Sequence, residues 1–540
     1  MTPVTTAVEN VLISAVEERL NGSGELRILD KRTGAWSARP WADLYERSVA
    51  IAARLQSTRQ HETQTVAVIG EPNFETLAAI CGAWLAGHGL TVLPGPNRFA
   101  SSESWAAKTL AQFETLGVAD VFGYGTALAA LDQQLVAQAG TGVRLADPEQ
   151  VATWGSAPSD FRSTPAHPDA HALYQGTAGS TGTSKTVALS ASAVLHHLLA
   201  VVQRQQFDRG RDILCSWLPL YHDMGLTMAL GGLVTGADTW LAPTSAFAQG
   251  PFDWLTWLTE SKATITAAPN FAYALLGRYA RVAKEGDLSA LRMAVNGAEP
   301  IDVDATGQFC SELGKFGFDR GAMAASYGLA EATCGITMPV PGTGLRFDLL
   351  PATATTPERK LALLGPAFDG VEMRIGTPEH TTDLAGLRAV GEIEFRSLAQ
   401  MTGYLGDQPV GPDEWIKTGD LGYLVDDQLV VCGRSKELIT IAGRNIFPQD
   451  VERAVDGVEG VRPGGIVALS VSGGRVRSDR LVIVAEFQGA DEAAARGEIS
   501  DRVAAECGIV PATVDFVEPG SLPKTTSGKL RRVEVAGRYR

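Results

Sequence analysis

Short apolar, β-branched segments alternate with helix-like segments early in the chain. The run TVAVIG (65–70) is followed by the helix-like EPNFETLAAICGAWLAGHG and then by a second strand-like segment, TVLPG (91–95). Strands that alternate with helices favour a parallel sheet covered by helices. ATITAAP (263–269) and LRMAVNGAEP (291–300) repeat the pattern later. The sequence therefore predicts an α/β fold.

The pattern changes in the last third of the chain. The Pro-, Gly- and Thr-rich segment 341–360 predicts a loop, and VEMRIG and GEIEFRS beyond it predict strands of a smaller sheet. We expect a large N-terminal domain over 1–435, with parallel-rich sheets, helices and a β subdomain, and a small α+β domain over 436–540. Within the small domain the expected strands are ELITIAG, GGIVALSV and LVIVAEFQ, and the expected helices are PQDVERAV and DEAAARGEISDRVAAECG.

Charge and hydropathy disfavour several functional classes. The 46 Lys and Arg residues against 61 Asp and Glu residues give a net charge of −15, which disfavours nucleic-acid binding. No apolar run approaches the roughly 18–20 residues of a membrane span. The N-terminus, MTPVTTAVENVLISAVEERL, lacks the basic and apolar regions of a signal peptide, so we expect a cytoplasmic protein.

The cysteines are scattered and form no C-x-x-C pair. This spacing argues against a zinc site and against a disulfide framework, and it favours small buried side chains. The six are Cys81, Cys215, Cys310, Cys334, Cys432 and Cys507.

One stretch, YQGTAGSTGTSK (174–185), alternates glycine with hydroxyl side chains and ends in a lysine. A Walker loop requires G-x-x-x-x-G-K-[ST], but a serine precedes Lys185, and the dinucleotide fingerprint G-x-G-x-x-G fails as well. A nucleophile elbow, G-x-S-x-G, differs from residues 178–182 at one position. A serine hydrolase would also need a downstream acid and histidine, and neither His222 nor His380 has a recognisable context.

A third interpretation of this stretch is a loop that grips phosphate. Its glycines allow backbone N–H groups to approach a polyphosphate closely, its hydroxyls add further bonds, and its lysine adds a cation. Taken alone, such a composition is also typical of a surface loop. The residues expected to grip phosphate are Thr177, Ser180, Thr181, Gly182, Thr183 and Lys185.

Six further polar clusters interrupt otherwise apolar sequence. They are WLPLYHDMGL (217–226), NGAEP (296–300), SYGLAEAT (326–333), KTGDLGY (417–423), GRSKELITIAGRNIFPQDVE (433–452) and LPKTTSGKLRR (522–532). In this order they resemble the adenylate-forming superfamily of acyl-CoA synthetases, adenylation domains and luciferases, over roughly residues 10 to 535. WLPLYHDMGL, NGAEPI, YGLAEAT and GRNIFPQDVE look most like fatty acyl-AMP ligases, which load acids onto acyl carrier proteins.

The resemblance implies a binding site for ATP and Mg²⁺. The stretch 174–185 would hold the β- and γ-phosphates, and Asp420 would accept hydrogen bonds from the ribose hydroxyls, with Arg434 nearby. Glu331 would hold Mg²⁺, a hard cation that prefers carboxylate oxygen. The adenine pocket would be lined by Gly297, Ala298, Glu299, Ser326, Tyr327 and Gly328.

The resemblance also implies the chemistry. A carboxylate oxygen attacks the α-phosphorus of ATP and pyrophosphate leaves, so catalysis is mostly positioning and charge neutralisation. Lys529 would reach in from the small domain, His222 would lie at the mouth of the acyl pocket, and Lys436 would be the hinge of a mobile small domain. The acyl pocket would be lined by residues near Trp217, Met224, Asn270, Phe271 and Tyr273.

Two departures from the family pattern bear on the nucleotide and on the thiol acceptor. Ser184 and Thr186 stand where the phosphate loop usually has proline and glycine around its lysine. Acyl-AMP ligases carry an insertion after YGLAEAT that disfavours CoA, and 333–365 leaves room only for a short version. The expected acceptor is the phosphopantetheine thiol of an acyl carrier protein.

Several alternatives stay open on the sequence alone. The acceptor could be free CoA, or the enzyme could hand its adenylate to a partner protein. A catalytically inactive adenylate-binding scaffold is a further alternative, although it predicts loss of residues that are present. We expect a monomer or a homodimer.

Overall fold

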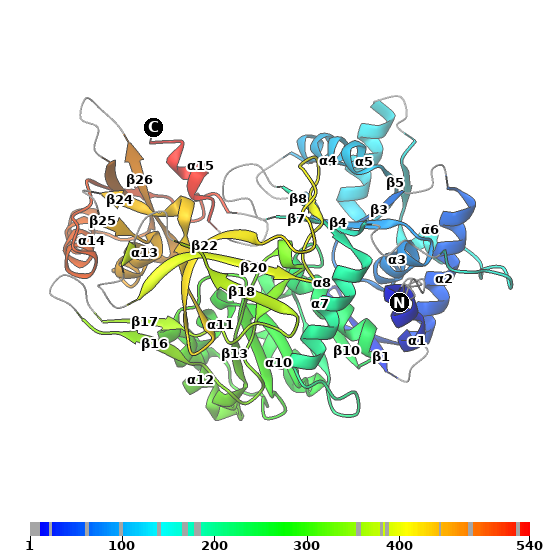
Figure 1. Cartoon of the computed structure of the whole chain (residues 1–540), viewed down its shortest axis with the longest axis horizontal. Coiled ribbons are helices and arrows are strands. Elements are labelled where there is room, and N and C mark those ends of the chain that lie inside the picture. The colour runs from blue at the N-terminus through cyan, green and yellow to red at the C-terminus, as the bar shows by residue number, and fades with distance from the viewer. Residues whose placement is uncertain are drawn as a thin grey trace, which may run out of the picture.

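Two seven-stranded sheets form most of the molecule, and a smaller C-terminal unit lies at one end of the long axis (Figure 1). Within the described residues, no helix combines the length and apolar character that a membrane span requires. The computed structural model describes residues 11–20, 24–59, 64–96, 101–137, 142–164, 171–177, 185–352, 358–377, 382–383, 388–441, 444–472, 479–524 and 530–539.

The first sheet contains the later of the predicted strands. In spatial order it consists of β13 (Met323–Ala325), β12 (Met293–Gly297), β11 (Ile265–Pro269), β9 (Leu214–Ser216), β10 (Thr239–Leu241), β1 (Glu25–Asp30) and β2 (Ala35–Pro40). All neighbours are parallel except β1 and β2. β11 and β12 are almost entirely buried, as expected of parallel strands covered on both faces. Pro269 pairs with Gly297, so the carboxyl ends of these two strands lie side by side.

The second sheet contains the predicted early strands. Its order is β21 (Gly403–Tyr404), β8 (Thr186–Ser190), β7 (His171–Gly176), β4 (Gly89–Leu93), β3 (Thr65–Ile69), β5 (Val118–Phe122) and β6 (Arg144–Ala146). The strands from β7 to β6 are parallel, whereas β8 runs antiparallel to both β7 and β21. The short strand β21 places Tyr404 opposite Val187 at this edge.

Two helices, α7 (Ala191–Arg204) and α8 (Asp223–Thr235), pack between the two sheets. α7 contacts β7 and β8, α8 contacts β9 and β10, and the helices contact each other. The hydroxyl of the N-cap residue Ser190 accepts a hydrogen bond from the Ala193 N–H at 3.0 Å, which fixes the start of α7. Further helices are α1 (Val11–Leu20), α2 (Trp41–Ser57), α3 (Phe74–Leu85), α4 (Ser102–Leu116), α5 (Gly125–Ala137), α6 (Pro148–Ala152), α9 (Thr244–Gln249), α10 (Asp253–Ser261), α11 (Asn270–Arg278) and α12 (Val303–Glu312).

Antiparallel β structure follows the two large sheets. β18 (Val371–Ile375), β20 (Ala389–Ser397), β22 (Ile416–Val425) and β23 (Gln428–Arg434) form a sheet, and β19 (Thr382–Asp383) pairs with β20. Two smaller ladders join β14 (Tyr327–Gly328) to β15 (Gly335–Thr337) and β16 (Phe347–Leu350) to β17 (Arg359–Ala362).

The loop predicted over 341–360 is therefore wrong in part. β16 lies inside that range, and its four residues pair antiparallel with β17. The strand was not recognised in the sequence because it is short and is flanked by proline, glycine and threonine. Its partner strand also lies several residues further along the chain.

The small unit contains the three strands and two helices predicted for it, together with β25 (Arg444–Ile446), β28 (Thr513–Val517) and α15 (Arg532–Ala536), which were not predicted. β26 (Val461–Ser472), β27 (Asp479–Phe487) and β28 form its sheet, and β24 (Ile439–Ile441) pairs with β25. Its helices are α13 (Pro448–Val455), α14 (Glu492–Cys507) and α15. The Arg359 guanidinium of β17 pairs with the Asp450 carboxylate of α13 at 2.6 Å, which ties the unit to the rest of the molecule.

Candidate active site

The carboxyl end of β12 faces the segment that follows β13. A side chain at Gly297 would place its Cβ 2.6 Å from Ser326 Oγ, so glycine is required for this close approach. The Ser326 N–H donates to the carbonyl oxygen of Asn296 at 2.8 Å. Ala298 has φ of 65°, a left-handed conformation that turns the chain sharply after the strand. Three of the residues expected at adenine therefore lie together at the strand ends, where ligands of α/β sheets usually bind.

The other three residues expected at adenine adjoin this surface. The Glu299 carboxylate accepts a hydrogen bond from the backbone N–H of Phe271. Gly328 packs so closely that a Cβ would lie 1.8 Å from the carbonyl oxygen of Cys334. Tyr327 joins this surface to the residues expected at ribose.

Asp420 holds two partners that come from different parts of the chain. The Tyr327 hydroxyl donates to Asp420 Oδ2 at 2.7 Å, and Arg434 Nε lies 3.2 Å from Asp420 Oδ1. Asp420 and Arg434 are cross-strand partners in β22 and β23, which explains why they meet. Burial and the neighbouring Asp420 charge raise the pKa of Tyr327, so the phenol stays protonated and donates. The structure thus brings the predicted ribose pair together beside Tyr327.

Glu331 lies in a short 3₁₀ helix, Ala330–Ala332, and is half-buried. The Tyr404 hydroxyl donates to Glu331 Oε1 at 2.6 Å, and burial together with the Glu331 charge raises the pKa of Tyr404. The described residues contain no cluster of three or more His, Cys, Asp or Glu side chains that could cage a metal. A single carboxylate suits Mg²⁺, which usually takes one or two protein oxygens and completes its shell with phosphate and water.

Thr177 and Lys185 close the base of the expected phosphate loop. The Thr177 N–H donates to the Lys185 carbonyl at 2.8 Å, and the Lys185 N–H lies 3.1 Å from Thr177 Oγ1. The Lys185 ammonium pairs with Asp407 at 2.9 Å and lies 4.3 Å from the centre of the Tyr404 ring. Lys185, Tyr404 and Glu331 are therefore in one chain of contacts. Ser180, Thr181, Gly182 and Thr183 lie outside the described residues.

His222 occupies the N-cap position of α8 and is partly exposed. Its Nδ1 lies 3.1 Å from Asp223 Oδ1, and the same oxygen accepts the Met224 N–H at 2.7 Å. Asp223 therefore orients the imidazole at the start of the helix.

Two predicted residues, Lys436 and Lys529, belong to the small unit. Lys436 is exposed in the 3₁₀ helix Ser435–Glu437, directly after Arg434. Lys529, the expected catalytic lysine, lies outside the described residues. Burial lowers the pKa of nearby Lys524, and the Glu299 charge acts on Lys524 in the opposite direction. Lys524 therefore lies within electrostatic range of Glu299, one of the residues expected at adenine.

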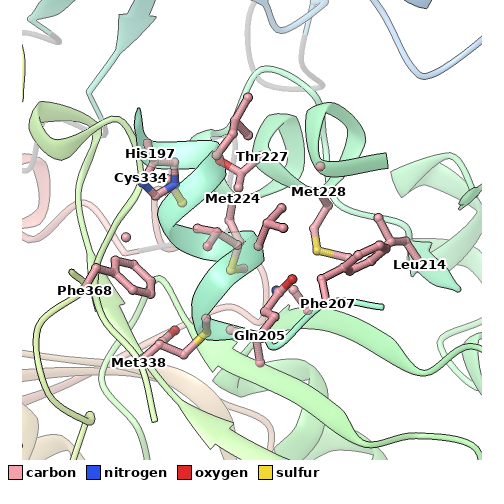
Figure 2. A pocket seen from close by; sticks show the side chains of 18 of the residues that line it. His197, Gln205, Phe207, Leu214, Met224, Thr227, Met228, Cys334, Met338 and Phe368 are labelled. Atoms are coloured by element: carbon pink, nitrogen blue, oxygen red, sulfur yellow. The ribbon is translucent and has the colours of Figure 1, made fainter. Parts of the chain in front are cut away.

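An apolar pocket with about 680 Å³ of space not filled by atoms lies between α7, α8 and the first sheet (Figure 2). Its lining includes Met224 of α8 and Val295 of β12, and it reaches Ser326 at the expected adenine surface.

The other four residues expected in an acyl pocket do not line this one. Trp217 is buried and stacks on Phe247 with ring centres 3.6 Å apart. Tyr273 donates its hydroxyl to the Val295 carbonyl at 3.0 Å, the Asn270 side chain bonds Asn296 and Thr306, and Phe271 is exposed. The predicted acyl pocket consisted largely of aromatic residues and did not include His197 and Thr337, which line the observed pocket. The only available signal for His197 was a histidine within an apolar helix.

The sequence matches two family descriptions that agree with this geometry. Residues 17–405 match the AMP-binding enzyme family, and residues 443–534 match the AMP-binding enzyme C-terminal domain. The chain belongs to the AMP-binding enzyme family.

Known AMP-binding enzymes and related ligases resemble the chain over most of its length. A putative ligase of Mycobacterium tuberculosis, Rv1013, is 34% identical over 91% of this chain and 93% of its own. JamA of Moorena producens, a medium-chain-fatty-acid–[acyl-carrier-protein] ligase, is 30% identical over 67% of each chain. A structure from a study of fatty acyl-adenylate ligases of E. coli and L. pneumophila superposes with a TM-score of 0.87. It is 28% identical and covers 98% of this chain and 97% of its own.

Proposed function

We propose that this enzyme uses ATP to convert a fatty or polyketide-like carboxylic acid to an acyl adenylate, and then transfers the acyl group to the phosphopantetheine of an acyl carrier protein. One observation supports formation of the acyl adenylate: Ser326 belongs both to the expected adenine surface and to the lining of the apolar pocket. An acid whose chain lies in that pocket would present its carboxylate beside the nucleotide. The two reactants of an adenylation are thereby brought together.

The chain's own residues would position the reactants and balance their charge. Asp420, held by Tyr327 and Arg434, would accept hydrogen bonds from the ribose hydroxyls. Lys185 and Lys529 would supply positive charge to the phosphates. Pyrophosphate leaves as a carboxylate oxygen bonds to the α-phosphorus, and no covalent enzyme intermediate is required.

Glu331 would hold Mg²⁺, which when bound neutralises phosphate charge. His222, fixed by Asp223 at the start of α8, would lie near the carboxylate end of the acid. Lys436 would be the hinge between a domain over 1–435 and a mobile domain over 436–540.

Two observations support a carrier protein over CoA. JamA is named as an acyl-carrier-protein ligase. In addition, the β16–β17 ladder lies after YGLAEAT, where acyl-AMP ligases carry the insertion that restrains the small domain, and its Arg359 pairs with Asp450 of that domain. Free CoA remains the second candidate, because this ladder is short.

Acid-dependent pyrophosphate release from ATP and Mg²⁺, measured with a panel of acids, tests the adenylation. AMP release is then compared with phosphopantetheinylated carrier, carrier lacking the phosphopantetheine, and CoA. We expect acceleration by the modified carrier alone. Acceleration by CoA alone would contradict the proposed acceptor, and absence of pyrophosphate with every acid would contradict the adenylation. Arg359→Ala is expected to raise the use of CoA relative to carrier.

A further inference from the structure

Two buried polar side chains in the apolar pocket each have one atom without a hydrogen-bond partner among the residues that the structure describes. His197 is 1% exposed and its Nε2 has no partner, and Thr337 is fully buried with no partner for Oγ1. Both residues line the pocket. Buried polar atoms are nearly always satisfied, and an unsatisfied one costs stability, so a pair of them in one cavity calls for a functional reason.

The two side chains face the pocket from a helix and from a strand. His197 projects from α7, and Thr337 is the last residue of β15. Gly335 lies two residues before Thr337 on that strand, so the two share a face. A Cβ built on Gly335 would lie 3.5 Å from His197 Cε1. The face of β15 that carries Thr337 is therefore turned toward the Phe368 ring, which lies nearest, and toward His197.

Four other polar residues of the lining have hydrogen-bond partners. The Thr235 hydroxyl donates to the Gly231 carbonyl at 2.7 Å, and Ser326 Oγ donates to the Asn296 carbonyl at 3.3 Å. Thr227 and Cys334 share a side-chain hydrogen bond. His197 Nε2 and Thr337 Oγ1 therefore differ from these neighbours, because each could still form a hydrogen bond with a ligand.

Asp223 relates His197 to the position expected for the substrate carboxylate. Figure 2 shows His197, Cys334 and Thr227 on one side of the pocket and Phe207, Leu214 and Met228 on the other. The charge of Asp223 acts on both His197 and Cys334. Asp223 also contacts His222, which is proposed to lie near the carboxylate, so we place the hydroxyl-binding pair toward that end of the acid.

His197 is neutral at physiological pH. Complete burial lowers its pKa to about 4, although the Asp223 charge acts in the opposite direction. A neutral imidazole offers one donor and one acceptor nitrogen, and a threonine hydroxyl can do either. A single hydroxyl on a ligand also donates and accepts, so it can satisfy both atoms whichever nitrogen of His197 carries the proton. A ketone only accepts, and an ammonium only donates.

We propose that the acid activated by this enzyme carries a hydroxyl group close to its carboxylate, held by His197 Nε2 and Thr337 Oγ1, with an apolar chain beyond. The inference rests on the proposed acyl-adenylating function and names its substrate class. His197 and Thr337 are then specificity-determining residues. An acid without the hydroxyl would fill the same pocket but leave two buried polar atoms unpaired, and sites built for a hydroxyl discriminate against analogues that lack it.

The test compares kcat/KM for pyrophosphate release with decanoic acid, its 2-, 3- and 4-hydroxy derivatives and 3-oxodecanoic acid. We expect at least one hydroxy acid to exceed decanoic acid by roughly ten- to hundred-fold, as the penalty for an unsatisfied buried group implies. Equal values for decanoic and all hydroxy acids would overturn the inference and leave adenylation intact. A preference for the oxo acid would overturn the hydroxyl assignment. No pyrophosphate with any acid would instead overturn the proposed function.

Variants separate recognition from folding. Thr337→Val removes the hydroxyl at nearly constant volume and is expected to reduce the preference for the hydroxy acid several-fold, while Thr337→Ser retains it. His197→Phe is expected to abolish the preference for the hydroxy acid over decanoic acid. Thr235→Val is the matched control, because its hydroxyl is bonded within α8, so both acids should change alike. An unchanged preference in Thr337→Val and His197→Phe would contradict the role of these residues.

Discussion

The Tyr327 hydroxyl donates a 2.7 Å hydrogen bond to Asp420, joining two segments that are 93 residues apart in the chain. Asp420 is 7% exposed and also contacts Arg434, so its carboxylate is held by a donor on each oxygen. Such a buried carboxylate has little freedom to turn. It therefore presents a fixed edge to a ligand, as recognition of two adjacent ribose hydroxyls would require.

Asp420→Asn is expected to raise the KM for ATP by ten-fold or more, since an amide presents only one acceptor oxygen and leaves Arg434 without its charge partner. Tyr327→Phe should give a smaller increase, because the carboxylate remains. Steady-state kinetics at varied ATP measure both. Tyr423→Phe is the control: its hydroxyl bonds Asp348 at 2.7 Å in the same β-rich part of the molecule. Equal effects of Tyr423→Phe and Asp420→Asn would indicate a purely structural role for Asp420.

Lys185→Ala is expected to raise the KM for ATP several-fold and to leave the KM for the acid nearly unchanged, because the lysine lies at the base of the phosphate loop. Its bond to Asp407 competes with phosphate. Asp407→Asn should therefore leave ATP binding equal or tighter. Unchanged ATP kinetics in Lys185→Ala would contradict a phosphate-binding role and favour the interpretation of 174–185 as an ordinary surface loop.

Glu331→Gln is expected to increase the Mg²⁺ concentration needed for half-maximal adenylation by about ten-fold, because the negative charge offered to the cation is lost. Tyr404→Phe removes the hydroxyl that occupies Glu331 Oε1 but keeps the ring beside Lys185. It should shift the Mg²⁺ dependence little or toward lower concentration. Titration of activity with Mg²⁺ at saturating ATP separates the two, and an unshifted curve for Glu331→Gln would place the cation elsewhere.

Lys436→Pro is expected to suppress thioester formation strongly while adenylation continues, because proline restricts the backbone where the proposed hinge must rotate. Pyrophosphate release reports the first step and acyl-carrier formation the second. Lys436→Ala is the matched variant, since it removes the charge without restricting the backbone, and it should retain both steps. Equal loss of both steps in Lys436→Pro would argue against a hinge at this position.

His88 gives a prediction about stability and pH. It is 3% exposed, neither ring nitrogen has a hydrogen-bond partner within the described part of the chain, and burial lowers its pKa to about 4. Between about 4 and the unfolded value near 6.5, the unfolded chain binds the additional proton, so stability falls as the pH falls through this window. The contribution is up to about 3 kcal/mol.

His88→Leu should therefore flatten the pH dependence of the free energy of unfolding between pH 6.5 and 4. It should also stabilise the protein slightly at pH 7, because two unsatisfied polar atoms are removed. Denaturant titrations of both proteins at several pH values measure the difference. Identical pH profiles would show that His88 finds a partner or water in solution.

Four strands of the parallel sheets and three of the small unit were predictable because each of them is a continuous local pattern. The apolar run at 65–70 and the amphipathic PQDVERAV segment determine their own structure with little help from distant residues. β16 was not predictable, since four residues among Pro, Thr and Gly become a strand only when β17 pairs with them. The expected ribose pair was predictable from motif order, and the structure explains it as a cross-strand pair.

The pocket was less accessible to sequence reasoning. Trp217 and Tyr273 are large and aromatic, and they fill the core beside β9 and β11, not the pocket. His197 and Thr337 gave no periodic signal, because each contributes one side chain from a separate element. Their significance depends on a lack of hydrogen-bond partners, which is a property of three-dimensional packing.

The two-residue strand β21 has a practical consequence for anyone who recombines this enzyme with its relatives. It pairs with β8, the strand that begins immediately after Lys185, and it carries the tyrosine that touches both Lys185 and Glu331. A chimera that exchanges only the stretch 174–185 would combine the loop of one enzyme with the β21 strand of another, so the contacts between them could be lost. Residues 403–407 should therefore be exchanged together with that stretch, although more than two hundred positions separate the two segments in the chain.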